Sequence, residues 1–207
     1  MLLTADQVVT GPAVYSPGWV EIAKGTVTAM GAGAGPRAVD TAQGDVALGG
    51  VTVVPGFVDM HTHGGGSGAF PDATEDGSRA AVALQRRHGT TTLVASLVSA
   101  HPDELLREAA VLGEQVQDGL IAGIHLEGPW LSPMRCGAHE PSALRSPELA
   151  EVERVFTAAK GGVRMVTIAP ELDGALPAIR RMVELGAVAA VGHTDASYEQ
   201  AKAAIEA

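Results

Sequence analysis

From Val51 onwards, apolar segments rich in β-branched residues alternate with helical ones, and no other feature constrains the fold as strongly. The expected strands cover residues 51–60, 90–98, 120–126, 163–169 and 187–191. The expected helices cover residues 79–87, 102–117 and 176–185, and two more start near residues 146 and 197. Alternating strands and helices form parallel β/α units, which make either an open doubly wound sheet or a closed barrel.

The residues at the strand ends favour the barrel. An open doubly wound sheet usually places a Gly-x-Gly-x-x-Gly phosphate loop after its first strand. Here His61-Thr62-His63 precedes the glycines, and no acid stands at the expected ribose-binding position. Ligand-type side chains at the carboxyl ends of several strands are typical of a (β/α)8 barrel, which takes roughly 250 residues when complete. We therefore expect an α/β fold in which residues 51–207 form the first part of such a barrel, incomplete in this chain.

Residues 1–50 follow a different pattern, with no helical periodicity. Short strand-like segments at Gln7–Val9, Trp19–Ile22 and Thr26–Met30 are separated by glycine and proline. Three or four short strands make a marginal sheet alone, so residues elsewhere in the chain are expected to complete it. The sequence thus predicts two domains, a small N-terminal β-sandwich segment (1–50) and the barrel part (51–207).

The composition indicates a globular protein of a reducing compartment. Hydrophobic residues make up 46% of the chain and charged residues 18%, which suits a sizeable core. The net charge of −10 argues against a nucleic-acid or anionic-membrane partner. The single cysteine, Cys136, excludes an internal disulfide. With neither a signal peptide nor an apolar stretch of about 20 residues, we expect a cytoplasmic protein.

Three strand ends carry side chains that bind divalent metals. His61 and His63 share one face of the first strand, because side chains on a strand alternate. Glu127 follows the third strand and His193 the fifth. Each alone has a simpler explanation, namely a chance pair, a salt-bridged carboxylate and a capping or core histidine. Their joint occurrence predicts an imidazole–carboxylate site of the catalytic type, with zinc or a similar ion.

Neighbouring polar residues are expected to support this site or to lie outside it. His125 shares the face of Glu127 but lies deeper, which favours a hydrogen-bonding role in the core. Asp195 either orients His193 or caps the last helix, and the cap is favoured. The sequence places two further histidines at the surface, His88 and His101.

The long segment Trp130–Leu144 follows the third strand and is a candidate substrate lid. Within it, His139 either hydrogen-bonds a substrate or faces solvent. Cys136 has no neighbouring base in the sequence, so we expect it to be a bystander.

Three motifs together resemble the N-acetylglucosamine-6-phosphate deacetylases of the amidohydrolase superfamily. They are Pro-Gly-Phe-Val-Asp-Met-His-Thr-His-Gly, His-Leu-Glu-Gly-Pro-Trp with a later Gly-Ala-His, and Val-Gly-His-Thr-Asp. The His-x-His element is common to the superfamily, whereas Leu-Glu-Gly-Pro-Trp followed by Gly-Ala-His is much more specific. The resemblance covers nearly the whole chain.

The resemblance implies a metal-dependent hydrolase that acts on a linear amide C–N bond. Such an enzyme converts N-acetylglucosamine 6-phosphate, a phosphorylated amino sugar, to glucosamine 6-phosphate and acetate. Carried over by position, Glu127 and His193 hold the main ion, His61 and His63 hold a second, and Ala138 and His139 contact the substrate. The expected cofactor is one or two divalent ions, with zinc as the expected metal, and the expected assembly is a cytoplasmic homodimer.

The resemblance also implies functional residues beyond Ala207. The family's third ligand to the main metal is a histidine, and its general acid/base is an aspartate, so no catalytic acid/base is expected within this chain. The 207-residue chain alone is accordingly expected to be inactive. None of the three lysines ends an expected barrel strand, which leaves a metal-bridging role to Glu127. The alternatives are another amidohydrolase, such as an amino-acid deacylase or a nucleobase deaminase, and a non-catalytic metal-binding remnant.

Overall fold

The computed structural model describes residues 1–207 and divides into two compact units, Met1–Gly56 and Phe57–Ala207. The predicted boundary after residue 50 falls inside strand β5 (Val46–Val53). The single strand expected over Val51–Met60 is wrong, because residues 54–56 separate β5 from strand β6 (Phe57–Thr62). Pro55 lies in this break, where it has no N–H to donate to a strand ladder.

The N-terminal unit is a five-stranded sheet with the order β2-β1-β3-β4, in which β5 pairs in parallel with β1. Its other strands are β1 (Leu2–Val9), β2 (Val14–Tyr15), β3 (Gly18–Ala23) and β4 (Thr26–Ala32). Antiparallel pairing joins β1 to β2, β1 to β3 and β3 to β4. The buried Asp45 carboxylate accepts hydrogen bonds from the backbone of Leu2 at 2.6 Å and of Asp40 at 2.9 Å, and it pairs with Arg37. These contacts fix the entry into β5.

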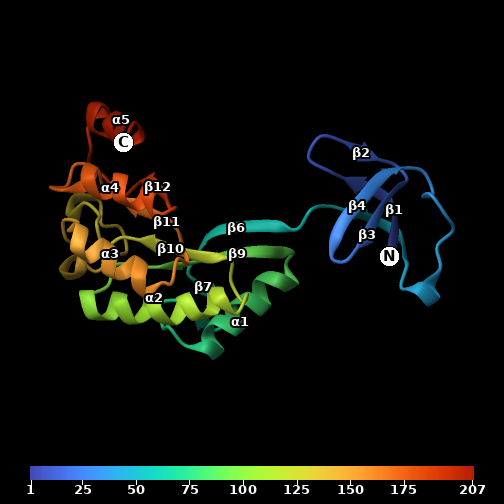
Figure 1. Cartoon of the computed structure of the whole chain (residues 1–207), viewed down its shortest axis with the longest axis horizontal. Helices are drawn as coiled ribbons and strands as arrows, with labels where there is room; N and C mark the ends of the chain where they lie inside the picture. The colour runs from blue at the N-terminus through green and yellow to red at the C-terminus, as the bar shows by residue number, and fades with distance from the viewer. The chain divides into compact units, whose positions relative to one another are not determined.

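The second unit contains a five-stranded parallel sheet with the order β12-β11-β10-β9-β6 (Figure 1). Besides β6, its strands are β9 (Thr90–Leu97), β10 (Gly123–Glu127), β11 (Val163–Ile168) and β12 (Val188–Val191). Neighbouring strands in the sheet are also successive β/α strands in the chain, as in a barrel wall. A two-stranded hairpin, β7 (Gly64–Gly65) with β8 (Gly68–Ala69), follows β6.

Five helices connect and extend these strands. They are α1 (Glu75–Arg87), α2 (Pro102–Gln117), α3 (Leu149–Ala158), α4 (Ala175–Glu184) and α5 (Tyr198–Ile205). The bounds predicted for α2 are confirmed. Helix α1 begins four residues earlier than predicted, because the Thr74 hydroxyl accepts from the Gly77 N–H and two acids occupy the first turn. No helix combines the length and apolar character that crossing a membrane requires.

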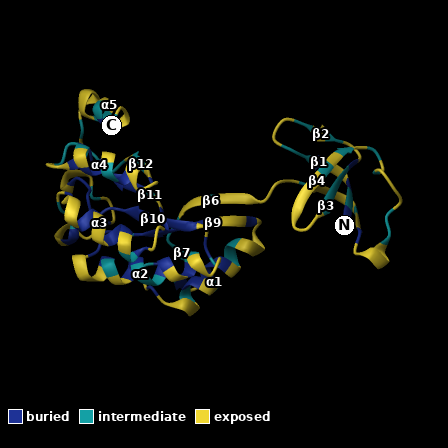
Figure 2. Cartoon of the chain, viewed as in Figure 1, coloured by how far each residue is buried: buried dark blue, intermediate teal, exposed yellow.

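The core lies between the sheet and its helices, and it is densest around the central strands. Every residue of β10 is buried, whereas most of β6 is exposed, as the dark blue and yellow ribbons show (Figure 2). Strand β6 pairs only with β9, and β12 pairs only with β11. The sheet is therefore an open parallel half-barrel, which confirms the predicted incomplete barrel.

Candidate metal centre

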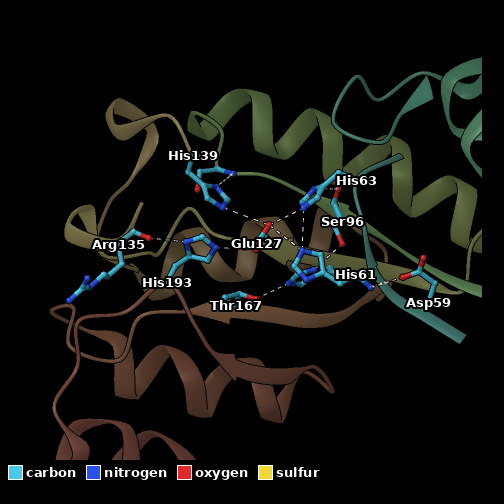
Figure 3. A network of polar contacts seen from close by, with 11 residues as sticks. Asp59, His61, His63, Ser96, Glu127, Arg135, His139, Thr167 and His193 are labelled. Carbon is cyan, nitrogen blue, oxygen red and sulfur yellow. Dashed lines mark hydrogen bonds and ion pairs between the residues drawn. The ribbon is translucent and has the colours of Figure 1, made fainter. Parts of the chain in front are cut away.

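The carboxyl ends of β6 and β12 and the loop after β10 bring four imidazoles around the carboxylate at the end of β10. Glu127 is the last residue of β10 and lies between two pairs of histidines (Figure 3). Its Oε2 is 3.3 Å from His61 Nε2, 2.9 Å from His63 Nε2 and 3.7 Å from His139 Nε2. Its Oε1 is 3.2 Å from His193 Nε2. The structure thus brings together all four residues that the sequence predicted as metal ligands, and it adds His139.

The first histidine pair comes from the end of β6. The Nε2 atoms of His61 and His63 lie 3.2 Å apart, so both nitrogens are close enough to bind one ion. The Nδ1 atom of His63 lies 3.2 Å from the Ser96 carbonyl, which only accepts hydrogen bonds. Nδ1 therefore carries the proton, and Nε2 keeps a free lone pair for a metal.

His193, two residues beyond β12, has the same arrangement on the other side of Glu127. Its Nδ1 donates to the Arg135 carbonyl at 2.9 Å, which leaves the Nε2 lone pair directed at the centre. Its φ of 49° lies in the left-handed region, which is unusual for a residue with a Cβ atom. Gly137 packs closely against the ring, since a Cβ at this position would lie 3.1 Å from His193 Cε1.

His139 differs from the other histidines in its tautomer. Its Nδ1 accepts a hydrogen bond from the Ser99 N–H at 3.1 Å, so the neutral ring carries its proton on Nε2. This Nε2 faces Glu127 as a donor. The side chain is only 4% exposed, so the solvent-facing alternative is wrong. Burial lowers the pKa of His139 more than the Glu127 charge raises it, which favours the neutral ring.

The donor atoms fit one or two divalent ions. His61, His63 and Glu127 form one group of ligand atoms, all within 4.8 Å of one another. Glu127 and His193 form a second group, and His139 lies within the same distance of both but faces them with a protonated Nε2, as a hydrogen-bond donor and not as a ligand. Imidazole nitrogen and carboxylate oxygen are the donors that zinc and similar ions take. Glu127 belongs to both groups, as a bridging carboxylate would.

Electrostatics keep Glu127 ionised. Burial acts to raise the pKa of this carboxyl, but the four imidazoles outweigh burial and hold the pKa below its usual range. A carboxylate that stays deprotonated at neutral pH is suited to metal ligation.

His125 supports the sheet beneath the site. It is fully buried, and burial lowers its pKa to about 4, so the ring is neutral near pH 7. Nδ1 lies 2.9 Å from Ser96 Oγ and Nε2 lies 2.8 Å from Thr167 Oγ1. The ring thus links β9, β10 and β11, which confirms the predicted core role. The two hydroxyl partners were not predicted, because polar residues inside apolar strands give no signal without the sheet order.

The prediction that Asp195 caps the last helix is wrong. Ser197 caps α5, with its hydroxyl accepting from Gln200 N and the Gln200 side chain accepting from Ser197 N. This reciprocal box satisfies two free N–H groups, which leaves Asp195 available for another partner. Its carboxylate accepts from Arg135 Nε at 2.9 Å and from Nη2 at 2.6 Å.

The long loop after β10 contains two short 3₁₀ turns, Pro133–Arg135 and Pro141–Ala143. Ala138 is exposed in this loop, directly before the buried His139, and its contact with a substrate stays a prediction. Cys136 is half-buried, and its Sγ donates to the Gly137 carbonyl at 3.8 Å. His88 and His101 are exposed at the ends of helices, as predicted.

Comparison with known proteins gives consistent relatives. Residues 52–207 match the amidohydrolase family. A crystal structure of N-acetyl-D-glucosamine-6-phosphate deacetylase from Mycobacterium smegmatis is 59% identical, with a TM-score of 0.95 over the whole of this chain and 53% of that one. A variant of that protein was solved in complex with N-acetyl-D-glucosamine-6-phosphate. The Vibrio furnissii N-acetylglucosamine-6-phosphate deacetylase is 33% identical over 88% of this chain and 46% of its own length.

The chain spans about half the length of these relatives. The family match covers the entire parallel sheet, Glu127 and the four histidines around it. From this match and the half-barrel fold, the chain belongs to the amidohydrolase family, and within it the chain resembles the N-acetylglucosamine-6-phosphate deacetylases.

Proposed function

We propose that this chain forms the metal-binding part of a deacetylase that hydrolyses N-acetylglucosamine 6-phosphate to glucosamine 6-phosphate and acetate. The observation that carries the proposal is the position of Glu127, at the carboxyl end of a parallel strand and within 3.7 Å of four imidazole nitrogens, three from strand ends and one from the loop after β10. The 59% identity to the Mycobacterium smegmatis enzyme supports this choice of substrate over other amidohydrolase substrates.

The chain's own residues have distinct tasks in this proposal. Glu127 and His193 hold the main ion, and His61 and His63 hold a second, with zinc as the proposed metal. A bound divalent ion supplies a Lewis acid that activates water and polarises an amide carbonyl. His139 presents its Nε2 proton from a buried position and donates a hydrogen bond to the substrate, beside Ala138. None of residues 1–207 is assigned as the general acid or base.

The resemblance to this group of enzymes also supports two broader proposals. We propose that the protein acts in the cytoplasm and assembles as a homodimer. Analytical ultracentrifugation of the purified protein tests the second proposal, because the molar mass measured for a dimer is twice that of the single chain.

The direct test is acetate release from N-acetylglucosamine 6-phosphate with added zinc, using the longest polypeptide that the gene encodes. Glu127→Gln keeps the size of the side chain but removes the charge and one anionic ligand atom. We expect this variant to lose its bound zinc. We also expect its turnover to fall at least 100-fold, which is the usual effect of removing a group that stabilises charge in an active site. Glu114→Gln, at an exposed glutamate of α2, is the matched control and should keep both properties.

The products separate this proposal from its alternatives. Ammonia in place of acetate would identify a deaminase, and turnover of N-acetyl amino acids alone would identify a deacylase. Metal binding by the wild-type protein without turnover of any of these substrates would identify a non-catalytic metal-binding protein. Full activity of Glu127→Gln would exclude this centre as the active site.

A further inference from the structure

His193 reaches the metal centre only through an unfavourable backbone conformation. Its φ of 49° is left-handed, and residues with a Cβ atom avoid this region unless their surroundings hold them there. A different φ at this position would move the ring relative to Glu127, because the ring is attached to this backbone. The contacts on either side of His193 therefore decide whether its Nε2 faces the centre.

Glu171 makes the contacts on the C-terminal side of His193. It lies in the loop after β11, and its Oε2 accepts from the Thr194 hydroxyl, while its Oε1 accepts from the Asp195 N–H at 2.7 Å. The Thr194 hydroxyl also accepts from the Ala196 N–H at 2.9 Å. One carboxylate thus fixes the two residues that directly follow His193.

The loop after β10 makes the remaining contacts. Ser132 N donates to the His193 carbonyl at 2.9 Å, and the His193 ring donates to the Arg135 carbonyl. The Arg135 guanidinium in turn binds the Asp195 carboxylate. Glu171 therefore holds one end of a chain of contacts that passes through Asp195 and Arg135 and returns to the His193 ring.

Glu171 is suited to this task as a charged group. Burial acts to raise the pKa of its carboxyl, but hydrogen bonds from the Thr194 hydroxyl and the Asp195 backbone outweigh burial and hold the pKa below its usual value. Charge-assisted hydrogen bonds of this kind are shorter and stronger than neutral ones. No ion pair of the structure includes Glu171, so hydrogen-bond donors and not a basic side chain stabilise its charge.

We propose that Glu171 is a positioning residue that holds His193 in its left-handed conformation and so aims Nε2 at the metal. The inference rests on the proposed function, since it takes His193 as a metal ligand. Glu171 touches neither His193's ring nor Glu127, and it acts through Thr194 and Asp195. The loop after β11 thus supports the centre through Glu171, although β11 supplies no ligand of its own.

The test is metal affinity, measured by titrating the metal-free protein with Co²⁺ and following its visible absorption. We expect Glu171→Ala to weaken binding 10–100-fold, the usual effect of losing a group that orients a ligand. Thr194→Val removes the hydroxyl that Glu171 binds and should weaken binding as well. Thr194→Ser keeps that hydroxyl and should restore the wild-type affinity and spectrum. Asp173→Asn, an exposed acid in the same loop, is the control and should change nothing.

Two results would overturn the positioning role. One is wild-type Co²⁺ affinity and spectrum in Glu171→Ala, and the other is equal affinity in Thr194→Val and Thr194→Ser. A failure of the proposed function gives a different result, since the wild-type protein would then bind no Co²⁺, or His193→Ala would bind it as tightly as the wild type. The near-ultraviolet circular dichroism of each metal-free variant verifies that the variant is folded.

Discussion

At the scale of single residues, Glu108 couples the stability of the second unit to pH. It lies on α2 with only 3% of its surface exposed, and its Oε2 has no hydrogen-bond partner. Burial raises its pKa to about 7, and the negative charges of Glu104 and Asp72 add to this effect against the opposing charge of Arg107. Its ionisation is therefore unfavourable in the folded state.

The sign of the pH dependence follows from proton binding. Between the ordinary carboxyl pKa of 4.5 and the folded value of about 7, the folded chain binds more protons than the unfolded chain. The stability that protonated Glu108 contributes to the folded state is thus fully present below pH 4.5 and is lost as pH rises through 7. We expect Glu108→Gln to raise the free energy of unfolding at pH 8 by about 1–3 kcal/mol and to have little effect at pH 4.5. Urea unfolding at both pH values measures this.

Glu114→Gln on the same helix is the control for Glu108. Glu114 is exposed and pairs with Lys160, so its replacement should change stability by less than about 1 kcal/mol at either pH. A Glu108→Gln effect that is equal at pH 4.5 and pH 8 would contradict the raised pKa.

Residue types at strand ends were enough to predict which side chains meet. His61, His63, Glu127 and His193 all lie at carboxyl ends of parallel strands, and such ends share one edge of a sheet. The sequence could not fix the tautomer of His139, because this depends on the backbone N–H of Ser99, 40 residues away. It also misassigned Asp195, whose partner Arg135 lies in a loop 60 residues earlier.

At the scale of elements, a partly buried ion pair anchors the loop after β10 to helix α3. The Arg145 guanidinium binds Glu151 through Nη2 at 2.6 Å and Nε at 3.0 Å, and its Nη1 donates to the carbonyls of Ala100 and Ala143. Glu151 also accepts from the indole N–H of the fully buried Trp130, at 3.1 Å. Both ends of the loop that carries His139 are thereby attached to one glutamate.

Removing this glutamate should loosen the loop and destabilise the unit. Glu151→Ala leaves the Arg145 charge and the buried Trp130 N–H without their partner. Breaking a fully buried ion pair from one side costs about 3–5 kcal/mol, and we expect a loss near the lower end because the Arg145 side chain is 23% exposed. Urea unfolding monitored by tryptophan fluorescence measures the loss. Glu153→Ala on the same helix removes an exposed partner of Arg181 and should cost less than about 1 kcal/mol. Equal losses of unfolding free energy in the two variants would show that the contacts of Glu151 with Arg145 and Trp130 contribute nothing beyond an exposed ion pair.

The bounds of a helix or strand were predictable where residues with a known preference for its ends are present. Pro102 with two acids after it defines the start of α2, and the prediction of its bounds is confirmed. The first barrel strand was misplaced, because the prediction joined residues 51–54 to the strand that follows Pro55-Gly56, whereas Pro55 and Gly56 separate β5 from β6. Periodicity alone cannot divide this segment between two units, since β5 pairs with β1 and β6 pairs with β9.

At the scale of the whole chain, the parallel sheet has two edges with unpaired backbone groups. The five strands from β6 to β12 cannot close a barrel of this type, because closure needs eight strands with a matching shear. Apolar side chains lie on the exposed strand β6, with exposed fractions of 59% for Phe57, 62% for Val58 and 61% for Met60. Exposed apolar edge strands of this kind associate with other chains.

We therefore expect the 207-residue polypeptide to self-associate through β6. Light scattering after size exclusion should give masses above the 21.1 kDa of one chain, increasing with concentration in the micromolar range. Placing lysines on the edge, as in the double variant Val58→Lys and Met60→Lys, should reduce this association, because charged side chains oppose edge pairing. Val14→Lys, at an exposed valine of the N-terminal sheet, is the matched control and should leave the masses unchanged. If the measured mass equals that of one chain at every concentration, the β6 edge does not cause association. If Val14→Lys reduces the association as much as the double variant does, the reduction is an effect of added charge and not of the β6 edge.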